Sequence, residues 1–162
     1  MKFEFDCAQI CLNGHLINRA VACLPENNRN FCSNCGQKAI TNCEGCGAEI
    51  RGSVMLLKQV FNDPYTVPFY CDNCGSAFPW TKARQEAAFE LVDLAENLSS
   101  DEKEGLRNSI PALAMDTPKT GVAVIKFKQY VAKAGVVIGN GLKDILVDVV
   151  SETVKKAIWP DS

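Results

Sequence analysis

Four short clusters of metal-ligand residues lie in the first half of the chain. Each cluster has two such side chains, separated by two or three residues, with a glycine inside or directly after the pair. Together they use seven of the nine cysteines and the one histidine of the chain. The eight candidate ligands are Cys11, His15, Cys32, Cys35, Cys43, Cys46, Cys71 and Cys74. Two tetrahedral zinc sites need eight ligands of this kind, so the pattern predicts two zinc ions per chain.

Turn-forming residues recur at fixed places in these clusters. An asparagine follows the first cysteine by two positions in the clusters that begin at Cys11, Cys32 and Cys71. Asparagine and glycine accept the backbone conformations that a tight turn around a metal needs. This shared pattern is the reason for pairing Cys11 with His15. Cys7 is a competing ligand that would leave His15 outside the site, and otherwise Cys7 and Cys23 are predicted to be small buried hydrophobic residues.

Three arrangements can share four clusters between two metals: sequential, nested or crossed. An aromatic residue precedes the second and the fourth cluster, Phe31 and Tyr70, as expected where a strand returns to the metal. We therefore favour sequential pairing, in which residues 36–42 connect two consecutive zinc ribbons, while the spacing alone also permits the crossed arrangement. The hairpins are predicted from short apolar or alternating segments at residues 1–10, 16–17, 48–50, 54–57 and 67–70.

The second half of the chain has the pattern of helices. Thr81 is a predicted helix cap, Ser99 with Glu102 matches a capping box, and Thr117 with Pro118 is a third start signal. The first predicted helix spans residues 81–98, and the second begins at residue 99 and is interrupted near Pro111. Two more are predicted for residues 119–138 and 142–158, with a break between them at residues 139–141.

These patterns together predict an α+β protein. Tandem zinc ribbons with short β-hairpins are expected over residues 1–78, and an all-α domain over residues 79–162. Each zinc ion would have four protein ligands and no open position, so both sites are predicted to be structural. The single histidine is used as a ligand, and no nucleophile with a neighbouring base is evident. We therefore predict no catalytic residue.

Charge and composition restrict the function further. The net charge is −2, and residues 1–80 carry six basic against seven acidic side chains, so no basic patch is predicted to attract nucleic acid. The N-terminal segment lacks the apolar core of a secretory signal, and no apolar run reaches the roughly 18 residues of a membrane span. A reducing cytosol is therefore expected, where paired cysteines bind metal rather than form disulfides.

The favoured function is a non-enzymatic zinc-binding adaptor. The two ribbons would present a rigid surface, and the helical half would pack on them or bind an unknown protein partner or a second copy of the chain. One alternative is nucleic-acid binding through the ribbon turns, using Arg19, Arg29, Lys38 and Arg51. A weaker alternative is peripheral membrane association of residues 119–159, where lysines and acidic residues are mixed on the polar face, which favours core packing instead.

Motifs along nearly the whole chain resemble a bacterial family of uncharacterised small proteins. The resemblance implies the two-part architecture and a bacterial cytosolic origin, and it carries no activity. The first half is also similar to double zinc-ribbon modules, which serve as binding platforms in unrelated proteins. The residues that carry the family resemblance are 9–15, 31–36, 43–46, 50–52, 67–68, 70–75, 79–81, 116–120 and 151–156.

Overall fold

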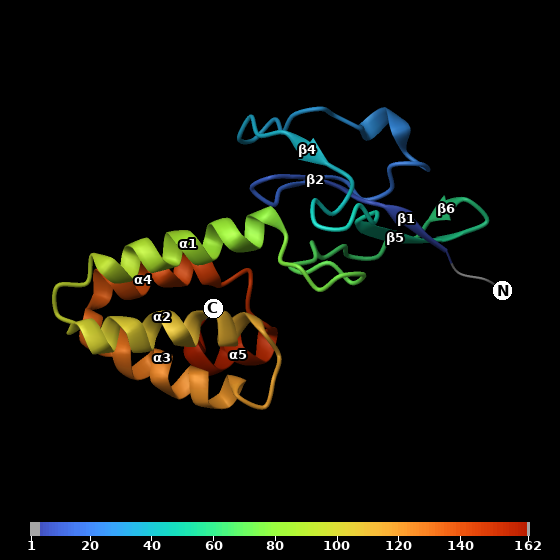
Figure 1. Ribbon diagram of the computed structural model, residues 1–162. Coiled ribbons are helices and arrows are strands. Elements are labelled where there is room, and N and C mark those ends of the chain that lie inside the picture. The colour runs from blue at the N-terminus through green and yellow to red at the C-terminus, as the bar shows by residue number, and fades with distance from the viewer. Residues whose placement is uncertain (1–3, 162) are drawn as a thin grey trace. The chain divides into compact units, whose positions relative to one another are not determined.

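The computed structural model describes residues 4–161 and has short strands in the first half and helices in the second (Figure 1). The predicted α+β class is confirmed. The start of the strand predicted for residues 1–10, with Phe3, lies outside the described residues. The chain divides into two compact units, Met1–Lys82 and Ala83–Ser162, and the division falls within α1 (Pro79–Asp93). The domain limits of 1–78 and 79–162 stay a prediction.

The first unit contains two small antiparallel sheets. One has the strand order β3-β2-β4, and the other has the order β1-β5-β6. The strands of the first are β2 (Gln9–Cys11), β3 (Leu16–Asn18) and β4 (Ala39–Ile40). The strands of the second are β1 (Glu4–Cys7), β5 (Arg51–Leu56) and β6 (Gln59–Val60). A short 3-10 helix, Pro25–Asn27, follows β3.

One N-terminal segment serves both sheets, because only Ala8 separates β1 from β2. The amide of Ala8 donates to the carbonyl of Ile50 at 2.8 Å, so the pairing continues across this join. The residues predicted to connect two separate ribbons instead form β4, in which Ile40 pairs with Ile10 of β2. The segment predicted to be a connector is therefore itself part of a sheet. Ile10 is completely buried, and pairing with β4 places Ile40 against the same core.

The core of this unit is small and includes ligand residues. Ala8, Ile10, Ile50, Phe78 and Trp80 form it together with the first cysteines of two clusters. The rings of Phe78 and Trp80 stack with centroids 4.7 Å apart, and the indole of Trp80 donates to the carbonyl of residue 68 at 2.8 Å. The predicted strands over 48–50 and 67–70 are reduced to isolated bridges. Hydrophobic burial and the turns around the cysteines therefore define this unit more than regular strands do.

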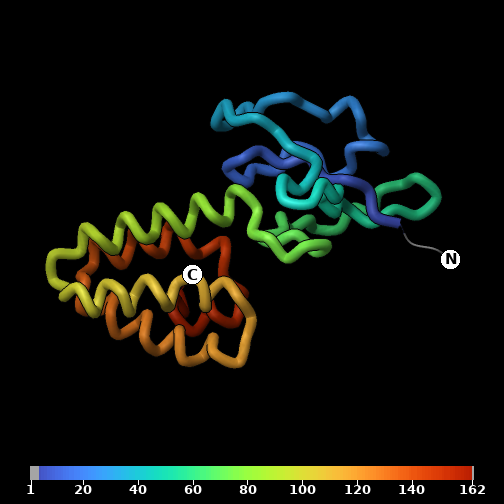
Figure 2. Tube along the Cα trace, viewed as in Figure 1, coloured from blue at the N-terminus to red at the C-terminus, as the bar shows by residue number. Residues whose placement is uncertain are grey.

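Five helices follow. They are α1, α2 (Ser100–Ala114), α3 (Thr120–Ala134), α4 (Val136–Leu146) and α5 (Glu152–Ile158). The chain reverses at Gly135 between α3 and α4, as the tube in Figure 2 shows in orange. Leu106, Ile110, Phe127, Leu142 and Leu146 are each at most 1% exposed and belong to the core of the second unit.

The capping box was predicted correctly, and two other helix starts were not. Ser99 accepts from the amide of Glu102, and the carboxylate of Glu102 accepts from the amide of Ser99. Thr81 does not cap α1: the helix begins two residues earlier, at Pro79, and the Thr81 hydroxyl donates to the carbonyl of residue 69 at 2.7 Å. Thr117 and Pro118 lie in a turn before α3, which begins at Thr120.

Two predicted interruptions also differ from the structure, and one break was not predicted. Pro111 lies inside α2, which continues to Ala114, since the missing N–H removes only one bond of the ladder. The break expected at residues 139–141 is at Gly135, where φ is +99°, and the last predicted helix is divided before Ser151, which caps α5. Gly139 and Gly141 are helical and face side chains of neighbouring helices. A Cβ on Gly141 would lie 2.5 Å from Leu91, so this glycine permits close packing.

Candidate metal centres

Three of the four clusters form the same backbone turn. In each, the first cysteine donates its amide to the carbonyl five residues on, at 2.8 to 2.9 Å, and its carbonyl accepts from the glycine after the second cysteine, at 2.8 Å. Those glycines, Gly36, Gly47 and Gly75, have φ between +71° and +75°, which only glycine adopts without strain. The turn holds both sulfurs on one side of the loop. The repeated C-x2-C-G sequence is therefore a repeated structural unit.

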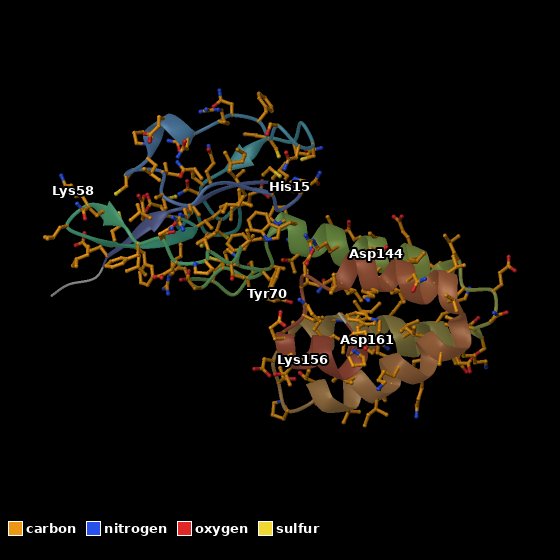
Figure 3. All side chains as sticks on the ribbon, turned by 180° about the vertical axis from the view of Figure 1, so that it is seen from behind. His15, Lys58, Tyr70, Asp144, Lys156 and Asp161 are labelled. Carbon is orange, nitrogen blue, oxygen red and sulfur yellow. The ribbon has the colours of Figure 1, made fainter. Side chains whose placement is uncertain are left out.

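The first cluster forms a shorter turn with the same result. The amide of Cys11 donates to the carbonyl of His15 at 3.0 Å, and the amide of Gly14 donates to the carbonyl of Cys11 at 2.8 Å. Gly14 has φ of +87°, and a Cβ there would lie 2.9 Å from Cβ of Trp80. A larger residue would clash with the core of the unit. Figure 3 labels His15 in this turn, directly after β2.

The structure brings the first two clusters together. Nδ1 of His15 lies 3.5 Å from Sγ of Cys11 and 3.6 Å from Sγ of Cys32. Sγ of Cys11 is 3.7 Å from Sγ of Cys35. The amide of His15 also donates to Sγ of Cys11 at 3.3 Å. The end of β2 with the turn after it, and the turn before β4, thus supply one group of three thiols and an imidazole, which we call site 1.

The third and fourth clusters form a second group, site 2, with four thiols. Sγ of Cys43 is 3.8 Å from Sγ of Cys74, and Sγ of Cys46 is 3.8 Å from Sγ of Cys71. Cys43 and Cys71 are buried, and Cys46 and Cys74 are exposed. Within each group all four ligand atoms lie within 4.8 Å of one another. The grouping is the one that sequential pairing predicts, and the nested and crossed arrangements are not seen.

These separations fit a tetrahedral metal with sulfur and nitrogen ligands. With Zn–S bonds of about 2.3 Å, the edge of a tetrahedron is about 3.8 Å, and a shorter Zn–N bond brings a nitrogen to about 3.5 Å from each sulfur. The sulfur pairs of site 2 and the imidazole contacts of site 1 match these values. Both groups are compatible with a bound metal, with three cysteines and one histidine in site 1 and four cysteines in site 2.

In each group, hydrogen bonds to sulfur lower the pKa of one cysteine, Cys32 in site 1 and Cys74 in site 2. The side chain and backbone of Ser76 lower the pKa of Cys74 to about 6. In Cys32, desolvation raises the pKa, but amides of Asn34 and Cys35 outweigh it and lower the pKa to about 7. Thiolates are the form in which cysteine binds a metal.

Two residues around site 2 were not identified from the sequence as part of it. The amide side chain of Asn73 donates to Sγ of Cys46 at 3.4 Å, and Ser76 interacts with Cys74. Asn73 was interpreted only as a turn residue, and its recurrence after the first cysteine of three clusters was the signal available. In proteins, such neighbours orient the ligands and tune the charge on sulfur.

The two remaining cysteines lie outside both groups. Cys7 is buried, and its thiol donates to the carbonyl of Thr41 at 3.2 Å. Burial first, and then the charges of Glu49 and Asp6, raise the pKa of Cys7 to about 11. Cys7 does not replace His15 in site 1. Cys23 is partly buried beside Met55.

The cationic residues suggested for nucleic-acid binding are mostly occupied. Arg19 and Arg29 donate to oxygen atoms of nearby loops, and Arg51 pairs with Asp72 at 2.7 Å. Within residues 4–161, Lys38 is the one residue of the four whose side chain forms no hydrogen bond or ion pair. The four side chains therefore do not form a free cationic surface.

Within the same described range, no helix has the length and apolar character needed to span a bilayer.

The comparison with known proteins agrees with this architecture. No curated protein and no solved structure matches the chain. The model of one family, described as an uncharacterized protein conserved in bacteria (DUF2321), matches residues 4–158, which includes both ligand groups and all five helices. The resemblance noted from the motifs is confirmed, and the chain belongs to this uncharacterised bacterial family.

Proposed function

We propose that this protein is a non-enzymatic, cytosolic zinc-binding adaptor. Two structural zinc ions hold the first unit, and the surface that they organise binds another protein. The observation that carries this proposal is the geometry of the two groups, each with four ligand atoms within 4.8 Å of one another. Four protein ligands complete a tetrahedral zinc site and leave no position for a substrate.

The donor atoms support zinc over other metals. Tetrahedral sets of thiolates and imidazole are typical of zinc, and all-sulfur sets also suit iron. The imidazole of His15 gives site 1 three thiolates and one imidazole, a set that is common among structural zinc sites. Zinc also has a clear physical role, because the apolar core of the first unit is small and contains two of the ligands, Cys43 and Cys71.

An exposed apolar surface beside site 1 supports a protein partner. Phe31 is 64% exposed directly before Cys32, and Leu16 is 40% exposed directly after His15. Both side chains, with Arg29, line a hollow of about 240 Å³. Aromatic and arginine residues are enriched where proteins bind one another, and an exposed aromatic ring held by a rigid loop loses little entropy on binding.

Affinity capture with a surface variant tests this proposal. Full-length protein, loaded with zinc, would be compared with Phe31→Glu, and Leu94→Glu would serve as the control because Leu94 is 70% exposed after α1, in the other unit. We expect Phe31→Glu to lose a protein that the parent and the control both retain. Purified partner and parent should then bind directly, with at least tenfold weaker binding for Phe31→Glu.

Three outcomes would contradict the proposal. Well under two zinc ions per purified chain would remove its structural basis. Equal capture by all three proteins would exclude the surface around Phe31 as the binding site. Salt-sensitive binding to DNA or RNA, weakened by replacing Lys38, would support the nucleic-acid function instead.

A further inference from the structure

The helical unit contains an apolar crevice that the proposed function does not use. It lies between α3 and α4, has a volume of about 440 Å³, and opens to solvent. Its apolar wall is formed by Phe127, Val131, Ala132, Val136, Ile158 and Trp159. Val136, which is part of this wall, is 77% exposed. Pockets that hold small organic ligands have volumes of roughly 300 to 1,000 Å³, so the crevice is of sufficient size.

One end of the crevice lies at the junction of α3 and α4. A single residue, Gly135, joins α3 to α4, so the two helices converge there and close one end. Trp159, directly after α5, lies edge-on to Phe127 with ring centroids 6.0 Å apart and forms a wall away from that end. A groove for a partner helix would need to be open along its length. A crevice that is closed at one end and limited in volume instead fits a small organic ligand.

The polar groups of the crevice favour an anion. Lys128, Lys143 and the amide of Asn140 line it, and none of the acidic residues in the described part of the chain does. Within residues 4–161 neither lysine has an ion pair, although Lys133 on α3 and Lys155 on α5 both pair with glutamates. The Lys128 ammonium donates to the carbonyl of residue 157, at 3.2 Å. Two cations beside an apolar wall are complementary to a carboxylate that carries an apolar tail.

We propose that this crevice binds a medium-chain carboxylic acid, with its tail against Trp159 and Val131 and its carboxylate at Lys128 and Lys143. A water molecule takes up about 30 Å³ in the liquid, and a methylene group is of similar size, so 440 Å³ corresponds to about fifteen such groups. A saturated acid of about twelve carbons fits this volume. The proposal goes beyond the adaptor function and is independent of the two metal sites.

Calorimetric titration of the zinc-loaded full chain with dodecanoate, below its micelle concentration, tests the proposal. We expect one site per chain with a dissociation constant on the order of 10⁻⁵ to 10⁻⁴ M, as for a single buried acyl chain. Lys128→Glu combined with Lys143→Glu should weaken binding at least tenfold. The control combines Lys126→Glu with Lys156→Glu, which changes the net charge equally on exposed residues that do not line the crevice, and it should bind like the parent.

A second pair of variants tests the location. Ala132 is exposed and lines the crevice, so Ala132→Trp should fill it and abolish binding, while Gln129→Trp, on an exposed position of α3 outside the crevice, should not. The proposal is overturned if dodecanoate does not bind, if Ala132→Trp binds it like the parent, or if dodecanol or dodecyltrimethylammonium binds as tightly. Sedimentation tests whether the chain forms a dimer that cannot bind dodecanoate. Such a dimer would mean that a second copy of the chain occupies the crevice, and it would overturn the proposal as well.

Discussion

Cys43 is a single ligand on which zinc binding at site 2 is expected to depend. Its sulfur is one of four in site 2, and it also belongs to the core of the first unit. Replacing it by serine leaves three thiols and removes the strong fourth ligand that a closed zinc site requires. We expect Cys43→Ser to reduce zinc from two ions per chain to one and to destabilise the first unit, as measured by elemental analysis and thermal unfolding.

Cys23→Ser is the control for this experiment, because Cys23 lies outside both groups. It should retain two zinc ions. A Cys43→Ser protein that also retains two would show that Cys43 is not a ligand.

The eight residues of the two groups were all identifiable from spacing, because their backbone turn is local. Three glycines with positive φ and the repeated cysteine pairs encode the turn within six residues. The roles of Asn73 and Ser76 were not identifiable, since a hydrogen bond to sulfur depends on where the loops meet in space. The exposure of Phe31 likewise depends on which other segments cover it.

The reversal between α3 and α4 depends on one glycine. Gly135 has φ of +99° and ψ of 168°, a conformation open almost only to glycine. We expect Gly135→Ala to lower the free energy of unfolding by about 1–3 kcal/mol. Gly121→Ala is the matched control, since Gly121 is exposed, lies in α3, and a Cβ there would contact nothing within 4 Å. It should raise stability by about 0.5 kcal/mol, and urea unfolding measures both changes. Equal stability of the two variants would contradict the role assigned to Gly135.

The capping box at the start of α2 predicts that the stability of the folded protein depends on pH. A hydrogen bond from Lys133 first, and then one from the amide of Ser99, lower the pKa of Glu102. Because the pKa is lower in the folded protein, this stabilisation is present above the ordinary pKa of glutamate, about 4.3, and is lost as pH falls through the folded value. The melting temperature of the parent should therefore fall in that range more steeply than that of Glu102→Gln. Parallel pH profiles for the two proteins would contradict this prediction.

At the level of elements, the one helix start that was predicted correctly is the one that short-range hydrogen bonds define. The Ser99 capping box was visible because four consecutive residues contain it. The interruption predicted at Pro111 was wrong. The free-energy cost of one lost hydrogen bond is small compared with the stabilisation from burying Ile110 and Leu113 on either side of the proline. Gly141 was interpreted as a break, whereas its contact with Leu91 of α1 can be recognised only after the helices are packed.

The two compact units of the whole molecule have different sources of stability. The second has fully buried side chains such as Leu106, Phe127 and Leu142, and the first has a small core that includes two ligands. Removing metal with a chelator should therefore unfold the first unit and leave the helices of the second intact. Hydrogen exchange measures this directly: amides of Ile10 and Ile50 should lose protection while those of Leu106 and Phe127 keep it. Loss of protection throughout the chain would contradict this separation.

The two-part organisation was predictable because it depends on local composition, ligand clusters first and helix signals afterwards. It was not predictable that one N-terminal segment supplies β1 to one sheet and β2 to the other, since β1 pairs with β5, which begins only at Arg51. A pairing over such a distance has no local pattern in the sequence. Residues 36–42 were predicted only as a connector, and the packing of Ile40 against the core that contains Ile10 explains why part of this segment forms β4.

The grouping of the ligands also has a consequence for synthesis. Site 1 is complete when Cys35 has left the ribosome, whereas site 2 is complete only with Cys74. A nascent chain emerges at about 5–20 residues per second, so the first four ligands are available seconds before the last one. A crossed arrangement would have left both sites incomplete until the third cluster or later had emerged. We therefore expect metal uptake to follow the direction of translation, with an early cross-link that limits the conformations of the growing chain while β5, the partner of β1, is still unmade.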